Sequence, residues 1–381
     1  MWLRALVDRR DRRARRHSKP ARALTAQATQ DGDAIHVQLG DRSFFLRGPA
    51  PIGPASGVFD GAALALAAIS ASSNDEIRLA SPVSPAMAAR LDELRYAIGL
   101  WRPDGLAPLR LVLDRVDEPA GTALAGRRLL CLSGGVDSTY AAIEAVTRHG
   151  FTDAVLVAGA DFETKDAPGF EALTARVAGT AERLGLRLHV VETDLRHLPF
   201  DWAMLHTLLL GFVLHTTGEA IGAVEGGFAM DNTPVQDLAR FPWGNSAAMA
   251  WLMGTEHFPI RALGGDLDRV QKLRAIAEHD EALLTGISVC WENPALGRNC
   301  GSCRKCTETR LNFLAAGLDE ALALPVREPL APLVDRLAVP KKQRDLRGAW
   351  VRWSEIVRHF PPGPLRGSME QKCNQVRRRL T

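Results

Sequence analysis

Apolar and polar positions alternate with two different periods along the first third of the chain. Between residues 34 and 47 they alternate singly on both sides of a Gly-Asp turn, which predicts a β-hairpin. An alanine-rich apolar run over 59–71 predicts a buried helix, and a mixed run over 84–101 predicts an amphipathic helix capped by its first residue, Ser84. Short apolar runs at 76–80 and 109–116 predict strands. These elements predict a small N-terminal α/β domain, and no catalytic constellation is visible in it.

From residue 127 onward, strand-like apolar runs alternate with helical periods. This order predicts a doubly wound sheet of parallel strands covered by helices. The expected strands are 129–132, 154–158, 188–192 and 220–224, and the expected helices are 139–149, 168–184 and 202–217. Ligands in such sheets bind beyond the carboxyl ends of the strands. Asp161, Asp194 and Glu225 lie at such ends and are candidates to hold Mg²⁺ or a ribose, although each also suits an ordinary acid at the end of a strand.

Two further patterns follow the last of these strands. Residues 228–254 are rich in Gly, Pro, Asn and Trp, which is typical of a lid or a substrate-binding loop. Over 260–274 the pattern predicts a strand, a Gly-Gly turn and a helix. Arg269 and Lys272 are three positions apart on this helix, so they face one side and suit a polyanion. The alternative is a pair of basic residues on a solvent-exposed face.

The composition is ordinary for a globular protein. The chain has 381 residues, of which 46% are hydrophobic and 24% charged, so it has room for two domains and a substantial core. No apolar run reaches the roughly 18 residues that a membrane span needs. The N-terminus lacks the apolar stretch of a secretion signal. A cytoplasmic location without membrane contact is therefore expected.

The net charge of +3 is distributed unevenly, with +7 over 1–22, +8 over 341–381 and hence −12 between them. Basic ends on an acidic body suit a nucleic acid or an acidic partner, or else they are solvated, half-ordered termini. The second interpretation is favoured because the N-terminal arginines have no interleaved aromatic residues. The expected organisation is a basic tail or helix over 1–22, the small domain over 23–120, the larger α/β domain over 121–320 and a basic helical extension over 321–381.

The most specific motif follows the first of the parallel strands. Four apolar residues lead into Ser-Gly-Gly-Val-Asp-Ser, and an alanine-rich helical run begins at once. The first turn of a helix has unpaired N–H groups and the positive end of the macrodipole, and two glycines let the backbone approach a phosphate. Asp137 can cap the helix or orient a cation. The spacing fits neither the Walker A motif nor the dinucleotide fingerprint. The residues expected to bind the phosphates are Leu132, Ser133, Gly134, Gly135, Val136, Asp137, Ser138 and Thr139.

A cluster of four cysteines is the second specific motif. They are Cys290, Cys300, Cys303 and Cys306, spaced C-x9-C-x2-C-x2-C. In a chain without an export signal such a cluster argues against disulfides and for a closed tetrahedral Zn²⁺ site of structural type. An iron–sulfur cluster is the alternative, and it is less favoured because the fourth cysteine is distant and polar residues separate the others. Cys131 and Cys373 are expected to be plain thiols.

The Ser-Gly-Gly-Val-Asp-Ser loop resembles the PP-loop of the ATP pyrophosphatase superfamily, whose enzymes cleave ATP between the α- and β-phosphates. Together with the cysteine cluster it resembles the 7-cyano-7-deazaguanine synthase (QueC) family, over roughly residues 127–318. The zinc motif of that family, S-x-C followed by C-G-x-C-x-x-C, is matched by 288–290 and 300–306, with Glu308 and Arg310 in family-like positions. The resemblance implies a PP-loop (HUP-like) fold with a C-terminal zinc-binding segment, and it implies ATP, Mg²⁺ and structural Zn²⁺ as cofactors.

The resemblance also implies a ligase activity. Such an enzyme adenylates 7-carboxy-7-deazaguanine or a similar carboxylate, releases pyrophosphate and passes the acyl group to an amine. In queuosine biosynthesis the amine is ammonia, and a second ATP dehydrates the amide to the nitrile. A carboxylate resists attack by an amine until one oxygen becomes a good leaving group, so the protein mainly positions anions and neutralises charge. The candidate catalytic residues are Asp137, Lys272 and Arg269.

The chain departs from compact family members, which begin almost at the loop, because about 125 residues precede it and a basic segment follows. In this it is similar to QueC-like proteins of bacterial antiphage operons, where the acceptor is a protein amine. Two other classes stay open. A tRNA-modifying PP-loop enzyme is favoured by the basic ends and predicts salt-sensitive tRNA binding. A non-catalytic scaffold predicts ATP binding without pyrophosphate release.

Overall fold

The computed structural model separates into two compact units. It describes residues 21–48, 52–53, 55–101, 106–121, 124–160, 167–198, 201–231, 244–290, 292 and 297–380. The first unit consists of the N-terminal part up to Arg127 with 192–226 and 248–260, and the second consists of 128–191, 227–247 and 261–381. This grouping cuts across the consecutive segments expected from the sequence, because two stretches of the central segment join the N-terminal unit. The expected basic tail lies outside the described residues, apart from Ala21 and Arg22.

The first unit contains a mixed sheet. Its strands are β1 (Ala23–Asp31), β2 (Ala34–Leu39), β3 (Arg42–Arg47), β4 (Glu76–Leu79) and β5 (Leu111–Leu113), in the order β3-β2-β1-β4-β5. β2 pairs antiparallel with β1 and with β3, so the predicted hairpin is confirmed, whereas β1–β4 and β4–β5 are parallel. The last residues of β8 (Arg187–Thr193) pair antiparallel with β3.

The helices of this unit pack through close backbone approach. They are α2 (Asp60–Ser73), α3 (Pro85–Trp101), α6 (Trp202–Ile221) and most of α8 (Ala247–Met253). Small residues let α2 lie against α6, and a side chain at Gly61 would come within 2.8 Å of the Phe212 carbonyl oxygen. The predicted cap is confirmed, because the Ser84 hydroxyl accepts a hydrogen bond from the Met87 amide at 3.1 Å.

The second unit contains the predicted alternation of strands and helices. Its strands are β7 (Asp153–Ala158), all but the first residue of β6 (Arg127–Cys131), all but the last two residues of β8, the last three residues of β9 (Ala223–Ala229) and all but the first residue of β10 (Ile260–Leu263), and the strand order is β10-β9-β6-β7-β8. The helices among them are α4 (Val136–His149), α5 (Ala167–Arg183) and α9 (Arg269–Asp280). An α/β class with mostly parallel strands is therefore confirmed. The strand expected at 220–224 is present but lies later in the chain, because α6 continues to Ile221 and stops at the left-handed Gly222, so that β9 begins at Ala223.

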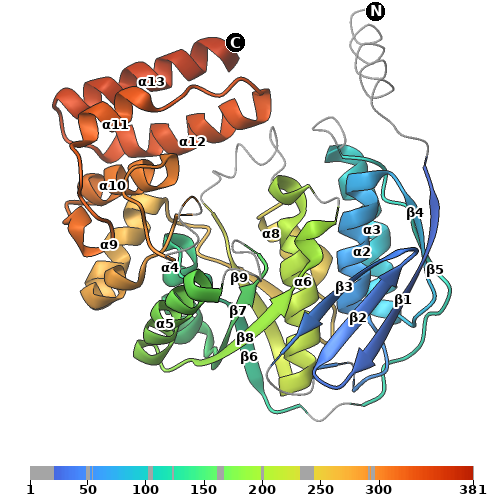
Figure 1. The fold of residues 1–381 in the computed structure, drawn as a ribbon. Helices are drawn as coiled ribbons and strands as arrows, with labels where there is room; N and C mark the ends of the chain where they lie inside the picture. The colour runs from blue at the N-terminus through green and yellow to red at the C-terminus, as the bar shows by residue number, and fades with distance from the viewer. Residues whose placement is uncertain are drawn as a thin grey trace, which may run out of the picture. The chain divides into compact units, whose positions relative to one another are not determined.

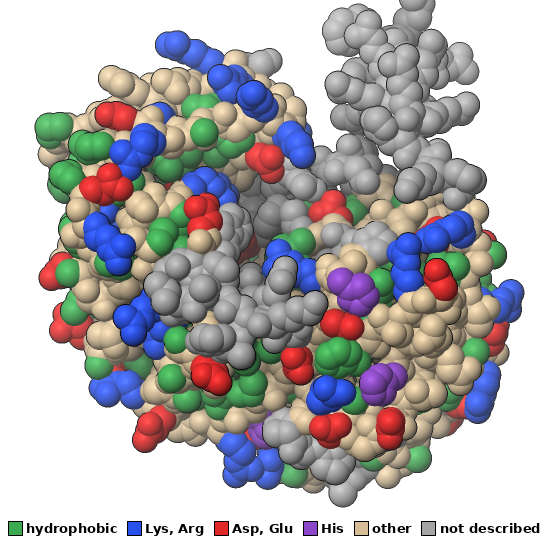
Figure 2. All heavy atoms as spheres, in the orientation of Figure 1, with side chains coloured by type: hydrophobic (Ala, Val, Ile, Leu, Met, Phe, Trp, Pro, Cys, Tyr) green, Lys and Arg blue, Asp and Glu red, His purple; other side chains and the backbone are tan. Residues whose placement is uncertain are grey.

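The C-terminal part of this unit is helical. It comprises α10 (Arg304–Ala316), α11 (Leu330–Arg336), α12 (Gln343–His359) and α13 (Pro364–Leu380), and Figure 1 shows α12 and α13 side by side. The half-ordered terminus expected from the charge is wrong for 341–380, because Trp353, Met369 and Val376 are fully buried in a core of their own. Figure 2 shows Lys and Arg side chains gathered along these helices, and α13 ends in three arginines.

Three short 3₁₀ helices complete the described elements, at Leu195–His197, Glu281–Gly286 and Glu320–Leu322. Within the described ranges, no helix has the length and apolar character needed to cross a membrane. Of the loop expected over 228–254, residues 228–229 end β9 and 247–253 form α8, while 232–243 lie outside the described residues.

Candidate nucleotide and metal sites

The predicted phosphate loop is a tight turn between β6 and α4. Gly134 has φ +77°, a left-handed conformation that favours glycine, and a side chain there would meet Val177 Cγ2 at 3.0 Å. Gly135 is the extended N-cap residue of α4, and no side chain caps the helix. The cap function considered for Asp137 is therefore wrong. The amide groups of the first turn are left for an external acceptor, as helix N-termini allow.

The hydroxyl groups of the loop are arranged around the same turn. Ser133 Oγ donates to Ser138 Oγ at 3.1 Å, and Ser138 Oγ lies 3.1 Å from the Gly135 carbonyl oxygen. The Thr139 hydroxyl is buried and has no hydrogen-bond partner among the described residues. A buried hydroxyl without a partner is costly, so this atom is a reason to expect a polar ligand at the loop.

The three candidate catalytic residues form a compact ionic cluster. Asp137, in the first turn of α4, accepts hydrogen bonds from Arg269 Nη2 and Lys272 Nζ, each at 2.8 Å. Lys272 Nζ also donates to the Met230 carbonyl oxygen at 2.8 Å, and the lysine side chain is fully buried. The exposed-face interpretation is thus wrong for Lys272. Asp137 and Arg269 remain partly accessible, with 19% and 29% of their side chains exposed.

Opposing effects set the ionisation of this cluster. Burial by itself would raise the pKa of Asp137, but the charges of Arg269 and Lys272 outweigh it and lower that pKa to about 2. Burial would lower the pKa of Arg269, but Asp137 and Asp231 raise it instead. Asp137 is therefore a carboxylate at neutral pH. Both of its oxygens are taken by protein cations, so it orients Lys272 and Arg269 at the helix N-terminus.

The start of α9 holds Arg269 in place. Asp268 is the N-cap residue and forms a capping box with Gln271, whose side chain accepts from the Asp268 amide at 3.0 Å. His359 of α12 lies 2.6 Å from the second oxygen of the Asp268 carboxylate. A hydrogen bond from α12 therefore stabilises the first turn of α9, the helix that carries Arg269.

The four predicted cysteines converge. Their sulfur atoms all lie within 4.8 Å of one another, and the Cys290–Cys303 and Cys300–Cys306 distances are both 3.8 Å. A tetrahedron of sulfur atoms about 2.3 Å from a zinc ion has edges of about 3.8 Å, so the donor set fits Zn²⁺. Hydrogen bonding from Cys303 lowers the pKa of the Cys290 thiol, and the same contact raises the pKa of Cys303 to about 12. Four thiolates this close together would repel one another without a bound cation.

Two residues around this cluster explain its shape. Asn299 Oδ1 accepts from the Val289 and Cys290 amides at 2.8 and 3.2 Å, and its Nδ2 donates to two carbonyl oxygens, so it holds the distant cysteine in place. Gly301 has φ +81°, and a side chain there would collide with the Pro325 carbonyl oxygen. Sequence analysis did not single out Asn299, and its position beside Cys300 is the only signal for it.

Comparison of the chain with protein-family models and with curated proteins finds no match. The resemblance of the loop and of the cysteine motif therefore remains an expectation. What the structure adds is a cluster of four cysteines that can hold a metal ion such as zinc.

The two family-like residues after the cysteines have structural partners. Glu308 is buried, and its carboxylate accepts from Trp353 Nε1 at 2.8 Å and from Arg352 at 3.1 Å, with Arg304 at 3.3 Å. Burial would raise the pKa of Glu308, but these arginines lower it. Arg310 is also buried and makes two 2.9 Å hydrogen bonds to Glu320. Both residues connect α10 to its neighbours.

The three strand-end acids have different environments. Asp161 lies outside the described residues. Asp194 accepts a hydrogen bond from the Phe45 amide at 2.9 Å, which gives it a structural role next to β3. Glu225 is buried within β9.

The sequence pattern did not indicate Arg176 on α5. Its half-buried side chain lies 3.4 Å from the Ser288 hydroxyl, and the amide of Ser288 donates to the Gly134 carbonyl oxygen of the loop.

Proposed function

We propose that this chain is a QueC-like, ATP-dependent ligase. It adenylates a carboxylate such as 7-carboxy-7-deazaguanine, releases pyrophosphate and passes the acyl group to an amine. The ionic cluster at the phosphate loop carries the proposal. One carboxylate and two cations leave one net positive charge at the positive end of α4, and Lys272 is buried where its charge is screened least.

The chemistry follows from where negative charge develops. A carboxylate oxygen attacks the α-phosphorus, the bond from that phosphorus to the bridging oxygen breaks, and both electrons leave with pyrophosphate. The helix N-terminus and Arg269 bind that product in this proposal, while Asp137, which is itself paired with Lys272, holds Arg269 in position. The amine then attacks the acyl carbon, AMP leaves with the electrons of the acyl–oxygen bond, and the amine loses a proton to solvent.

The metals have separate roles in this proposal. Mg²⁺ supplies charge neutralisation to the ATP phosphates when bound. Cys290, Cys300, Cys303 and Cys306 would hold Zn²⁺ as a closed structural site, because all four positions of a tetrahedron are filled by sulfur. Closed sites leave no position for substrate, so the zinc would stabilise the segment that follows the loop.

The test measures pyrophosphate and AMP release from Mg·ATP by mass spectrometry, with and without 7-carboxy-7-deazaguanine. We expect release that depends on the acid. Arg269→Gln should lower it about a hundredfold, the usual loss for one electrostatic contact. The matched control is Arg183→Gln, which breaks an exposed arginine–aspartate pair to the other end of α9 and should change release less than about twofold.

The other outcomes separate the alternatives. ATP binding without release under any acid indicates a scaffold, and release that depends on tRNA indicates a tRNA-modifying enzyme. Equal release by the Arg269→Gln and Arg183→Gln variants contradicts the assignment of the ionic cluster. Free nitrile formed as efficiently as by a compact enzyme of the family, with no transfer to protein amines, contradicts the antiphage type and leaves the biosynthetic one.

A further inference from the structure

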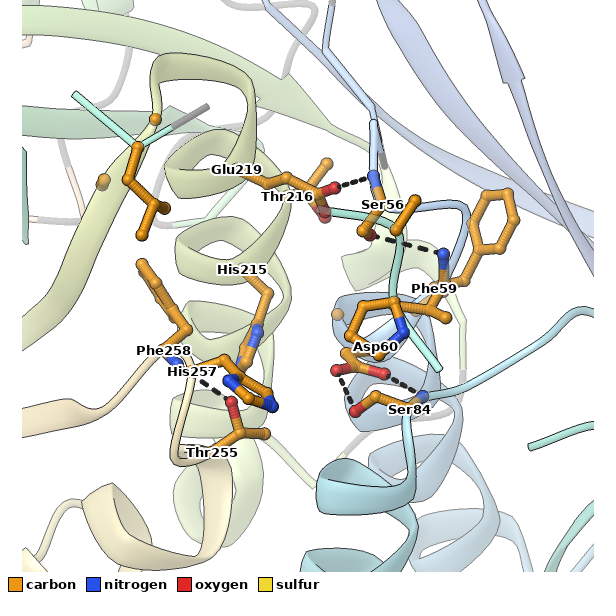
Figure 3. A pocket seen from close by; sticks show the side chains of 18 of the residues that line it. Ser56, Phe59, Asp60, Ser84, His215, Thr216, Glu219, Thr255, His257 and Phe258 are labelled. Atoms are coloured by element: carbon orange, nitrogen blue, oxygen red, sulfur yellow. Dashed lines mark hydrogen bonds between the residues drawn. The ribbon is translucent and has the colours of Figure 1, made fainter. Parts of the chain in front are cut away.

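A pocket of about 550 Å³ lies within the first unit, in the region where sequence analysis found no chemistry. It is formed by the start of α2, the last turns of α6 and the segment 255–258. Figure 3 shows side chains of α6 pointing toward those at the start of α2. Every residue that lines it belongs to the first unit, whereas the loop, the ionic cluster and the four cysteines belong to the second.

The polar groups of this pocket are mainly acceptors. Asp60 accepts from the Ser84 amide and hydroxyl at 2.8 and 2.7 Å, and Glu219 accepts from the Ser56 amide at 2.5 Å. Each carboxylate oxygen has a second lone pair, so both acids can accept more. Glu256 is a third carboxylate in the lining. Lys and Arg are absent from the residues that line the pocket.

His215 adds another acceptor. It is buried, and its Nε2 lies 2.8 Å from the Met253 carbonyl oxygen, which can only accept, so Nε2 carries the proton. Burial lowers the pKa of His215, which keeps the imidazole neutral and leaves a lone pair on Nδ1. No described residue donates to that nitrogen.

A second polar group beside His215 also lacks a partner. Thr216 lines the pocket, and only 8% of its surface is exposed. Its hydroxyl makes no hydrogen bond to the described part of the chain. A buried hydroxyl is normally satisfied by protein, water or ligand. Together with the Nδ1 lone pair of His215, this hydroxyl indicates that the pocket receives a polar group from outside.

The remaining lining is apolar and aromatic. Phe258 lies against His215 with ring centroids 5.0 Å apart, and Val58 and Ile35 also line the cavity. Aromatic faces attract cations as well as apolar groups. An anion would meet three carboxylates and neither a Lys nor an Arg among the lining residues. A metal ion is disfavoured because, in the part of the chain that is described, the four cysteines are the only set of such ligand atoms close enough to share one.

We infer that this pocket binds a protonated organic amine. The ammonium group donates to the carboxylate wall, with Glu219 as its main acceptor, and the carbon part of the ligand packs on Phe258. A cation with N–H donors matches a wall of acceptors, and an apolar body matches the aromatic side. The inference does not depend on the proposed nucleotide chemistry, since no residue is shared.

The test titrates the full chain with phenethylamine at pH 7 by isothermal calorimetry. 3-Phenylpropionate and 2-phenylethanol are the anionic and neutral analogues of the same shape. We expect saturable binding of the amine only. Glu219→Gln keeps an oxygen for the Ser56 amide but removes the charge, and it should weaken binding about tenfold, the cost of a charged hydrogen bond.

Two further variants make the result decisive. Asp92→Asn removes an exposed acid of α3 that pairs with Arg95 and does not line the pocket, and it should leave binding unchanged. Thr216→Val keeps the shape and removes the free hydroxyl, so it should weaken binding a few-fold. Circular dichroism of each variant checks that the first unit is folded. Lack of saturation up to about 10 mM amine, equal binding of 3-phenylpropionate, or equal affinities of the Glu219→Gln and Asp92→Asn variants would overturn the inference.

Discussion

At the scale of single residues, Asp137 joins α4 to α9 through the buried Lys272 and the partly exposed Arg269, so its removal should lower the stability of the fold. Asp137→Asn keeps the size of the side chain but leaves Lys272, which has no exposed surface, without its counter-charge. Breaking a buried pair in this way costs about 3–5 kcal/mol. We expect urea denaturation at pH 7 to show a loss of about 3 kcal/mol. Glu370→Gln, which breaks an exposed pair on α13, should cost less than about 0.5 kcal/mol, and equal losses would contradict the prediction.

The same carboxylate predicts a pH dependence. Its pKa in the folded protein is about 2, below the value of about 3.9 expected when the chain is unfolded. A group whose folded pKa is lowered contributes stability that is fully present above the unfolded pKa and is lost as the pH falls toward the folded pKa. The stability difference between wild type and Asp137→Asn should therefore shrink by roughly 2 kcal/mol between pH 5 and pH 2. Other carboxylates cancel in this difference, so a difference that stays constant would show that Asp137 is not the titrating group.

The sequence indicates which residues form the ionic cluster of Asp137, Arg269 and Lys272, but it does not show how they contact one another. The Ser-Gly-Gly-Val-Asp-Ser string and the i, i+3 pair of basic residues identify the positions. The pattern cannot tell that Lys272 is buried, because its partners Asp137 and Met230 are distant in sequence. His215 and Glu219 were missed for a similar reason, since they interrupt an apolar helix whose period gives no signal of a pocket.

At the scale of elements, the cysteine cluster should contribute stability through its metal. Cys303 is both a cluster member and the N-cap residue of α10, and its sulfur accepts from the Cys306 amide. We expect the purified chain to hold about one zinc ion. Cys303→Ser should lose that metal and unfold the segment around α10, because structural zinc contributes folding energy directly.

Metal content by mass spectrometry and thermal unfolding would check this. Cys373→Ser is the control, since Cys373 is a buried cysteine of α13 outside the cluster. A stable Cys303→Ser protein with full activity would refute a structural metal site. Iron in place of zinc would favour the iron–sulfur alternative.

The contact between α10 and α12 allows a smaller test. Trp353 is fully buried and donates its indole N–H to Glu308 at 2.8 Å. Trp353→Phe removes this donor to a buried carboxylate, so we expect a loss of about 2 kcal/mol in urea denaturation. Trp350→Phe, one turn earlier on the same helix, removes no hydrogen bond of the described residues and should cost less. Similar losses in both variants would assign the effect to packing alone.

Long periodic elements were predictable, and their ends were less so. α2, α3 and the β2–β3 hairpin follow from local patterns that tertiary contacts reinforce. β1 was missed because small and polar residues such as Thr25 and Gln27 weaken its alternation. The boundary between α6 and β9 was misplaced because both are apolar, and only Gly222 marks where the helix ends.

At the scale of the whole molecule, the charge pattern was misleading about the C-terminal segment. Its eight net positive charges suggested a solvated tail. The apolar positions of α12 and α13 nevertheless meet in a common core that also contains Val270 of α9 and Leu311 of α10. The division into two units could not be read from the sequence either, because 192–226 and 248–260 return to the N-terminal unit after the phosphate loop.

This core predicts that the C-terminal helices are required by the proposed nucleotide site, although they lie far from it in sequence. Deleting 341–381 removes His359, which binds the N-cap residue of α9, and Arg352 and Trp353, which pair with Glu308. Because Arg269 is the first residue of α9, we expect the truncated chain to aggregate or to lose ATP binding in calorimetry. Lys341→Gln with Lys342→Gln removes two exposed charges of the same segment and leaves the core intact, so it should bind ATP normally. A truncated chain that stays soluble and binds ATP normally would show that the helical core is not required. Loss of ATP binding in the Lys341→Gln, Lys342→Gln variant as well as in the truncated chain would mean that this segment supplies basic charge rather than a helical core.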